Sequence, residues 1–99
     1  MVLESAEILV KPGMEEAFEA GVREAAPLFK RAQGCSGMRL QRGIENPQAY
    51  RLLVEWATLE DHTVHFRGSE DFQEWRRLVG HCFDGAPNVT HLNGVLEAF

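Results

Sequence analysis

Two hydrophobic periodicities alternate along this chain, and their order restricts its fold more than any other feature. Apolar residues at every second position, typical of strands, occur over 6–11, 36–44, 50–57 and 89–96. Apolar residues at steps of three and four, typical of amphipathic helices, occur over 14–29 and, with a break at Gly68-Ser69, over 62–79. The expected order is strand, helix, strand, strand, helix, strand.

This order predicts a ferredoxin-like α+β fold, βαββαβ, in which two helices cover one face of a four-stranded antiparallel sheet. The opposite face is left bare, and it is not purely polar. It carries either Leu53 and Ala57 or Leu52, Val54 and Trp56, depending on which side of the third strand the helices cover. Because an apolar patch on a small domain usually marks a partner surface, we expect a homodimer joined through the sheet face.

Size and charge narrow the class of protein further. Ninety-nine residues, 44% of them hydrophobic, suffice for one core but not two, so we expect a single domain over 1–99. Ten basic residues against 15 acidic ones, with no basic cluster, argue against nucleic acid as a partner. No apolar run could span a bilayer and no leader pattern is present, so we expect no membrane association and a cytoplasmic location.

Several short signals predict local structure. Pro27 interrupts the first helical stripe and predicts a kink or lost hydrogen bonds over 23–26, and Gly34 is expected to end that helix. Thr58 with Asp61, and later Ser69, resemble helix caps. Cys35 and Cys82 match no zinc spacing and are expected to be free thiols.

Three segments of the chain resemble the antibiotic biosynthesis monooxygenase (ABM) family, whose fold is the dimeric α+β barrel. They are VKPGMEEAFE at 10–19, AQGCSGMRLQRGIENPQAYRLLVEWATLEDH at 32–62 and FRGSEDFQEWRRL at 66–78. Within them the resemblance rests on the order and spacing of four pairs: Pro12-Gly13, Gly34-Cys35, Glu55-Trp56 and Asp61-His62.

The resemblance implies oxygenation of hydroxylated aromatics, quinols or polyketide anthrones with dioxygen and without flavin, haem or metal, so no cofactor is expected. Haem breakdown by related dimers is a second family activity, and it resembles an Asn on the first strand with a Trp and a His on the second helix. This chain has Ala6, Phe66 and Arg76 at those places, which argues against haem breakdown.

Cofactor-free oxygenation needs a base, because a substrate anion gives an electron to dioxygen more readily than the neutral substrate does. His62 is the preferred base, since it matches the family's histidine after the Trp-Glu strand, and Trp56 matches a tryptophan at the pocket of family members. Four further residues are candidates for substrate binding: His65, His91, Phe66 and Arg67. His62 and His65, three apart on a helix, are expected to share a face.

Each candidate also has a purely structural interpretation. Trp56 and Phe66, like Phe72 and Trp75, fit a core as well as a cavity wall, and His62 fits a structural residue at a helix start. The pair His62 and His65 with a third histidine could also bind a transition metal, although no spacing defines the site and no metal is predicted. The alternative function is a non-catalytic dimeric domain that binds a small ligand or serves as a stress or regulatory module.

Overall fold

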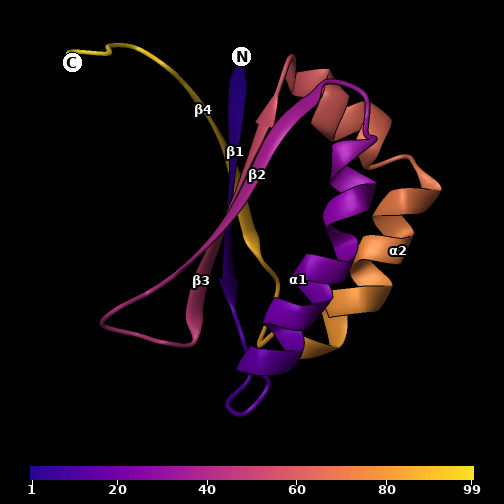
Figure 1. Ribbon diagram of the computed structural model, residues 1–99, viewed down its shortest axis with the longest axis vertical. Helices are drawn as coiled ribbons and strands as arrows, with labels where there is room; N and C mark the ends of the chain where they lie inside the picture. The colour runs from indigo at the N-terminus through magenta and orange to yellow at the C-terminus, as the bar shows by residue number, and fades with distance from the viewer.

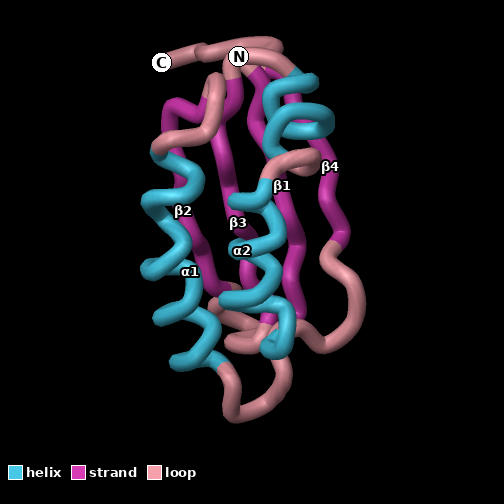
Figure 2. Tube along the Cα trace, turned by 90° about the vertical axis from the view of Figure 1, so that its right-hand side faces the viewer, coloured by secondary structure: helices cyan, strands magenta, loops and turns pink.

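Both helices lie on the same face of one antiparallel sheet (Figures 1 and 2). The computed structural model describes all 99 residues. The sheet order is β2-β3-β1-β4, which confirms the ferredoxin-like prediction. The elements are β1 (Val2–Leu9), α1 (Glu15–Lys30), β2 (Cys35–Arg42), β3 (Ala49–Trp56), the π-helical turn η1 (Asp61–Phe66), α2 (Glu70–Val79), the 3-10 turn η2 (Gly80–Cys82) and β4 (Asn88–Asn93).

Two strands differ in length from the prediction. Strand β1 begins at Val2, four residues earlier than expected, because Glu4 and Ser5 are buried strand residues that break the apolar alternation. Strand β4 ends at Asn93 rather than at position 96. Asn93 pairs with Val2, so beyond it β1 offers no backbone groups to bond with. The tail from Gly94 then leaves the sheet on the side away from the helices (Figure 1).

The core fills the space between the sheet and the two helices. Alternate residues of β1 and β3 point toward the helices, and α1 and α2 present their predicted apolar stripes. Burial of this surface is the main favourable contribution to folding. The largest fully buried side chains are Trp56, Phe18, Phe29, Leu52, Val10, Val54, Val79 and Cys82.

Helix α1 runs without a break through Pro27. Proline has no N–H to donate, so the lost bond is confined to one position near the C-terminal end of the helix. The helical pattern resumes after Pro27, since the Arg31 N–H donates to the Pro27 carbonyl at 3.2 Å. The two cysteines form no disulfide: Cys82 is buried and Cys35 half-buried.

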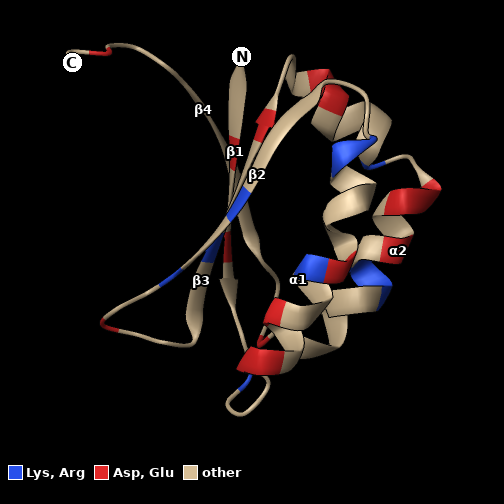
Figure 3. Ribbon diagram, in the orientation of Figure 1, with Lys and Arg blue, Asp and Glu red and all other residues tan.

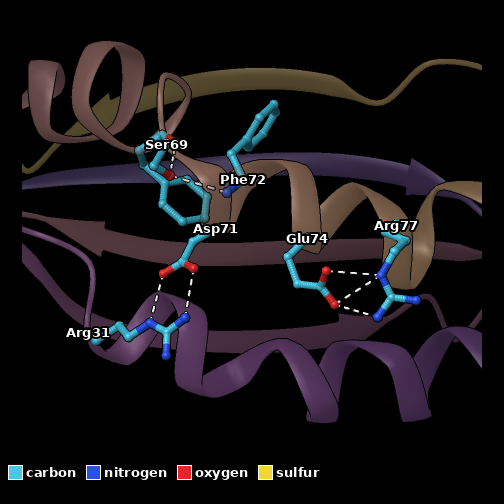
Figure 4. Close-up of polar contacts among 7 residues, drawn as sticks. Arg31, Ser69, Asp71, Phe72, Glu74 and Arg77 are labelled. Carbon is cyan, nitrogen blue, oxygen red and sulfur yellow. Dashed lines mark hydrogen bonds and ion pairs between the residues drawn. The ribbon is translucent and has the colours of Figure 1, made fainter.

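The predicted cap at Ser69 is confirmed, and a second contact at the same end of α2 joins the two helices (Figure 4). Ser69 Oγ accepts a hydrogen bond from the Phe72 N–H at 3.2 Å. The Arg31 guanidinium donates two hydrogen bonds, of 2.7 and 2.8 Å, to the Asp71 carboxylate. The first contact caps the backbone of α2, and the second holds the start of α2 against the end of α1.

The cap predicted at Thr58 and Asp61 is reciprocal. The Thr58 N–H donates to the Asp61 carboxylate and the Asp61 N–H donates to Thr58 Oγ1, both at 3.1 Å. The buried Asp61 carboxylate also accepts from Gln33 Nε2 at 3.1 Å. Gly34 passes this carboxylate with a φ of +79°, and its carbonyl accepts from the Ala57 N–H at 2.7 Å.

Charges of both signs are interspersed over the helices and the sheet (Figure 3). On the bare sheet face they pair within the chain, with Arg51 2.7 Å from Glu7 and Arg39 3.7 Å from Glu55. No helix is both long and apolar enough to cross a membrane.

Replacing Gly34 with alanine should destabilise the fold by about 2–4 kcal/mol. A Cβ at this position would overlap the Asp61 carboxylate, and its positive φ is costly for any L-residue. Gly85→Ala is the matched control, because Gly85 has a φ of +87° but open space around it, and it should cost only about 1–2 kcal/mol. Urea unfolding measures both. Equal losses in the two variants would contradict the role given to the Gly34–Asp61 contact.

Candidate active site

A buried carboxylate lies at the centre of the candidate site. Glu4 occupies the inner face of β1, opposite Val54 of β3 and His91 of β4. The strand alternation turns its side chain toward the helices, with Ala6 and Ile8, and only 5% of the residue is exposed. A buried carboxylate is stable only with polar partners, and the surrounding elements supply them.

Three side chains from three elements surround this carboxylate. Trp56 Nε1 of β3 donates a hydrogen bond to Glu4 Oε1 at 3.0 Å. His62 Nε2 of η1 lies 3.3 Å from the same oxygen. His62 Nδ1 in turn lies 2.8 Å from His91 Nε2 of β4. These four residues, Glu4, Trp56, His62 and His91, are called the Glu4 cluster below.

The π-helical turn places His62 in this cluster. Its i to i+5 bond, from Arg67 N–H to the His62 carbonyl at 3.1 Å, widens the turn, so residues four or five apart share a face. His62 and Phe66 are therefore both buried. His65 is exposed, and the expectation that it shares a face with His62 is wrong, because that expectation assumed the narrower α-helical turn.

The indole of Trp56 also supports the His62 ring. The two rings stack with centroids 5.3 Å apart and an interplanar angle of 17°. Trp56 is fully buried and packs against Phe66 in the core. It therefore contacts Glu4 and His62 from the core and does not line the cavity.

Burial sets the protonation of the cluster. Burial, the Arg67 charge and His91 lower the pKa of His62 to about 4, so its imidazole is neutral at pH 7. Burial and Arg67 also lower the pKa of His91. Burial raises the pKa of Glu4, opposed by the Trp56 hydrogen bond and the Arg67 charge. The contact between His62 and Glu4 is therefore not a permanent salt bridge, since burial disfavours the charged form of each partner.

A cavity of about 560 Å³ opens beside the cluster, between the sheet, α2 and the loop after η2. Glu4 and His62 contribute polar groups to its wall, and Arg67 and Arg76 contribute cations. The rest of the wall is mostly apolar and includes Phe72, Trp75, Phe83, Pro87, Leu52 and Val89. A small polar cluster in an apolar wall is typical of a ligand site.

A larger hollow of about 1000 Å³ lies between α1 and β2. Its wall carries Glu19, Arg23 and Lys30 but no histidine, and none of the Glu4 cluster reaches it. Size alone does not make a site for proton transfer, so the smaller cavity is the candidate active site. No three His, Cys, Asp or Glu side chains in the structure are arranged to hold a metal ion.

The structure separates the residues that the sequence singled out. His62 and Arg67 reach the cavity, and His91 contacts His62 without lining it. Phe66 lies in the core and His65 faces solvent. Glu4 is not among the residues that the sequence singled out. The available signal was a carboxylate in the inward register of β1, two positions before Ala6.

Comparisons with known proteins agree with this fold and identify the family. The family model described as antibiotic biosynthesis monooxygenase matches residues 1–78. The uncharacterized protein YczJ of Bacillus subtilis is 42% identical over 95 residues, which are 96% of this chain and all of YczJ.

Two solved structures illustrate the range of the match. A Bordetella bronchiseptica protein with the provisional name of antibiotic biosynthesis monooxygenase is 57% identical, with a TM-score of 0.95 over 96% of this chain and 97% of that one. SnoaB of Streptomyces nogalater, described as a cofactor-independent oxygenase, is 14% identical, with a TM-score of 0.83 over 98% and 95% of the two chains. SnoaB shares the fold. With the family match over 78 residues, these findings establish that the chain belongs to the antibiotic biosynthesis monooxygenase family.

Proposed function

We propose that this protein is a cofactor-independent monooxygenase that oxidises a hydroxylated aromatic, quinol or polyketide-type substrate with dioxygen. The observation that carries the proposal is the position of Glu4 and His62, two buried acid–base groups in the wall of a mostly apolar cavity, with Trp56 and His91 in contact with them. The family membership and the description of SnoaB as a cofactor-independent oxygenase also support it.

The proposed reaction needs the protein to form and protect a substrate anion. A base removes a proton from the substrate, and the anion then gives an electron to dioxygen. For a methylene carbon between two aromatic rings, two hydrogens leave the carbon and one oxygen atom replaces them. The second oxygen atom leaves with both hydrogens as water. Hydrogen and oxygen therefore balance with dioxygen as the only other reactant.

The cavity has parts suited to each requirement. The Glu4 cluster, with His62 at its centre, is the base. Arg67 supplies a positive charge for the anionic oxygen of the substrate. Phe72, Trp75 and Phe83 offer aromatic surface to a planar substrate and exclude water.

We also propose that the working unit is a homodimer joined through the bare sheet face. Leu3 and Leu53 are only half-covered on that face, and Leu92 is exposed. Two extensions project on the same side: the β2–β3 connection with Ile44, which is 90% exposed, and the tail after β4 (Figure 1). The tail carries Val95 and Leu96, which are 94% and 85% exposed. A partner seated on the sheet would cover these apolar groups.

Oxygen uptake by metal-free protein tests the proposed activity. With a panel of hydroquinones and anthrones, the wild type should consume oxygen faster than buffer autoxidation. His62→Ala should lower kcat/KM by about 10²-fold or more, because it disrupts the base. Trp56→Phe keeps an aromatic ring but removes the hydrogen bond to Glu4, and should also lower the rate.

His65→Ala is the matched control, because His65 belongs to the same turn but faces solvent, and it should leave the rate unchanged. Ligand binding without oxygen uptake would instead support the non-catalytic alternative. Uptake that is equal in the wild type and His62→Ala would exclude His62 from the reaction.

Light scattering tests the proposed dimer. The wild type should have about twice the 11.2 kDa mass of one chain at micromolar concentration. Leu53→Asp should shift the mass to that of a monomer, because it places a charge at the centre of the apolar contact. Val64→Asp is the control, since Val64 is an exposed apolar residue on η1. A monomeric wild type, or a dimer in Leu53→Asp, would contradict the sheet-face interface.

A further inference from the structure

We infer that Glu4 Oε2, rather than a ring nitrogen of His62, is the atom that receives the substrate proton. This inference rests on the proposed function, because it names the base within the same site. It assigns a catalytic role to Glu4 and positioning roles to Trp56, His62 and His91.

Glu4 Oε2 is the one polar atom among the side-chain atoms of Glu4 and His62 with which no other residue makes a polar contact. Both ring nitrogens of His62 are already engaged, Nε2 facing Glu4 and Nδ1 facing His91. A substrate could reach a His62 nitrogen only if one of these contacts were broken. Glu4 Oε1 is also engaged, by Trp56 and by His62. Glu4 Oε2 has no partner in the protein, although the side chain is 6% exposed and lines the cavity.

The charge that protonation would create also favours Glu4 over His62 as the acceptor. A proton on His62 would create a buried imidazolium near Arg67, and the low pKa of His62 reflects that cost. A proton on Glu4 would instead neutralise a buried carboxylate. Burial favours this neutral form, and it therefore raises the pKa of Glu4. Of the two groups in the cavity wall, Glu4 is therefore the better acceptor.

The proton transfer is balanced within the site. The substrate O–H or C–H bond breaks, an O–H bond forms at Glu4 Oε2, and the negative charge moves from the carboxylate to the substrate. Arg67, which faces the same cavity, remains near that charge in both states. The proton held by Glu4 is then available to the oxygen atom that leaves as water.

The other cluster members orient the carboxylate. When Glu4 is ionised, Trp56 Nε1–H donates to Oε1 and His62 Nε2 lies 3.3 Å from the same oxygen, which leaves Oε2 as the carboxylate oxygen without a partner in the protein. In the tautomer that carries its proton on Nε2, His62 accepts a hydrogen bond at Nδ1 from His91 Nε2–H, over the 2.8 Å that separate these two nitrogens.

Polar and charged groups surround Glu4 from every neighbouring element. They are His62 from η1, His91 from β4, Trp56 from β3, Arg67 after η1, Arg76 from α2 and the Cys35 thiol from β2, whose pKa the Glu4 charge helps to raise. Of these, the Trp56 hydrogen bond and the Arg67 charge oppose the rise that burial causes in the pKa of Glu4. Because Glu4 must be ionised to act as the base, kcat/KM should fall as the pH falls through its raised pKa, above the ordinary value of 4.5.

Glu4→Gln tests the assignment, because it keeps the size of the side chain and an oxygen for Trp56 but cannot take up a proton. Its kcat/KM should fall by about 10²–10⁴-fold near neutral pH, and the acidic limb of the pH profile should disappear. Raising the pH until the substrate ionises by itself should restore activity. Glu16→Gln is the control, since Glu16 is an exposed carboxylate in the first turn of α1, away from the cavity and from the bare sheet face, and should retain wild-type kinetics. An unchanged acidic limb in Glu4→Gln would overturn the inference.

A second readout does not depend on oxygen chemistry. A chromogenic nitrophenol bound to the wild type should show the absorbance of its anion at pH values where the free nitrophenol is neutral. Glu4→Gln should lose that anion band while circular dichroism shows the same fold. If the wild type consumes no oxygen but the band depends on Glu4, the proposed function fails and the proton acceptor is still identified. If the band persists in Glu4→Gln, Glu4 is not the acceptor.

Discussion

The hydrogen bond from Trp56 to the buried carboxylate of Glu4 is the interaction on which the site depends. A carboxylate on the inner face of a sheet is costly unless donors reach it, because burial removes its hydration. Trp56 supplies such a donor from β3, His62 Nε2 of η1 lies 3.3 Å from the same oxygen, and His91 of β4 contacts His62. The two central strands, the edge strand β4 and one turn are thereby joined at a single polar point inside an otherwise apolar core.

The two faces of the sheet carry different kinds of residues. The inner face holds the core and the cavity that Glu4 and Arg67 share. The outer face carries ion pairs that are satisfied within the chain, half-covered leucines and two projecting segments. Association through the outer face would therefore complete the burial of apolar surface without closing the cavity, which is enclosed by elements of one chain.

Much of the fold was predictable, because alternation and helical stripes act locally and the caps at Thr58 and Ser69 have short-range patterns. The candidate site was less predictable from the sequence. Glu4 looks like a surface residue there, and only the pairing of β1 with β3 and β4 shows that its side chain lies on the inner face of the sheet. His62 is buried and His65 exposed because they lie on a π-helical turn, and no local sequence pattern predicts the hydrogen bonds of such a turn. The early end of β4 likewise depends on where its partner strand begins.

The most direct test of the buried cluster is the titration of the histidines by ¹H–¹⁵N NMR. His62 should stay neutral as the pH falls from 7 and titrate near 4. A His62 that titrates at or above its ordinary value of 6.5 would contradict this prediction, because the imidazole would then be solvated or held as an ion pair with Glu4.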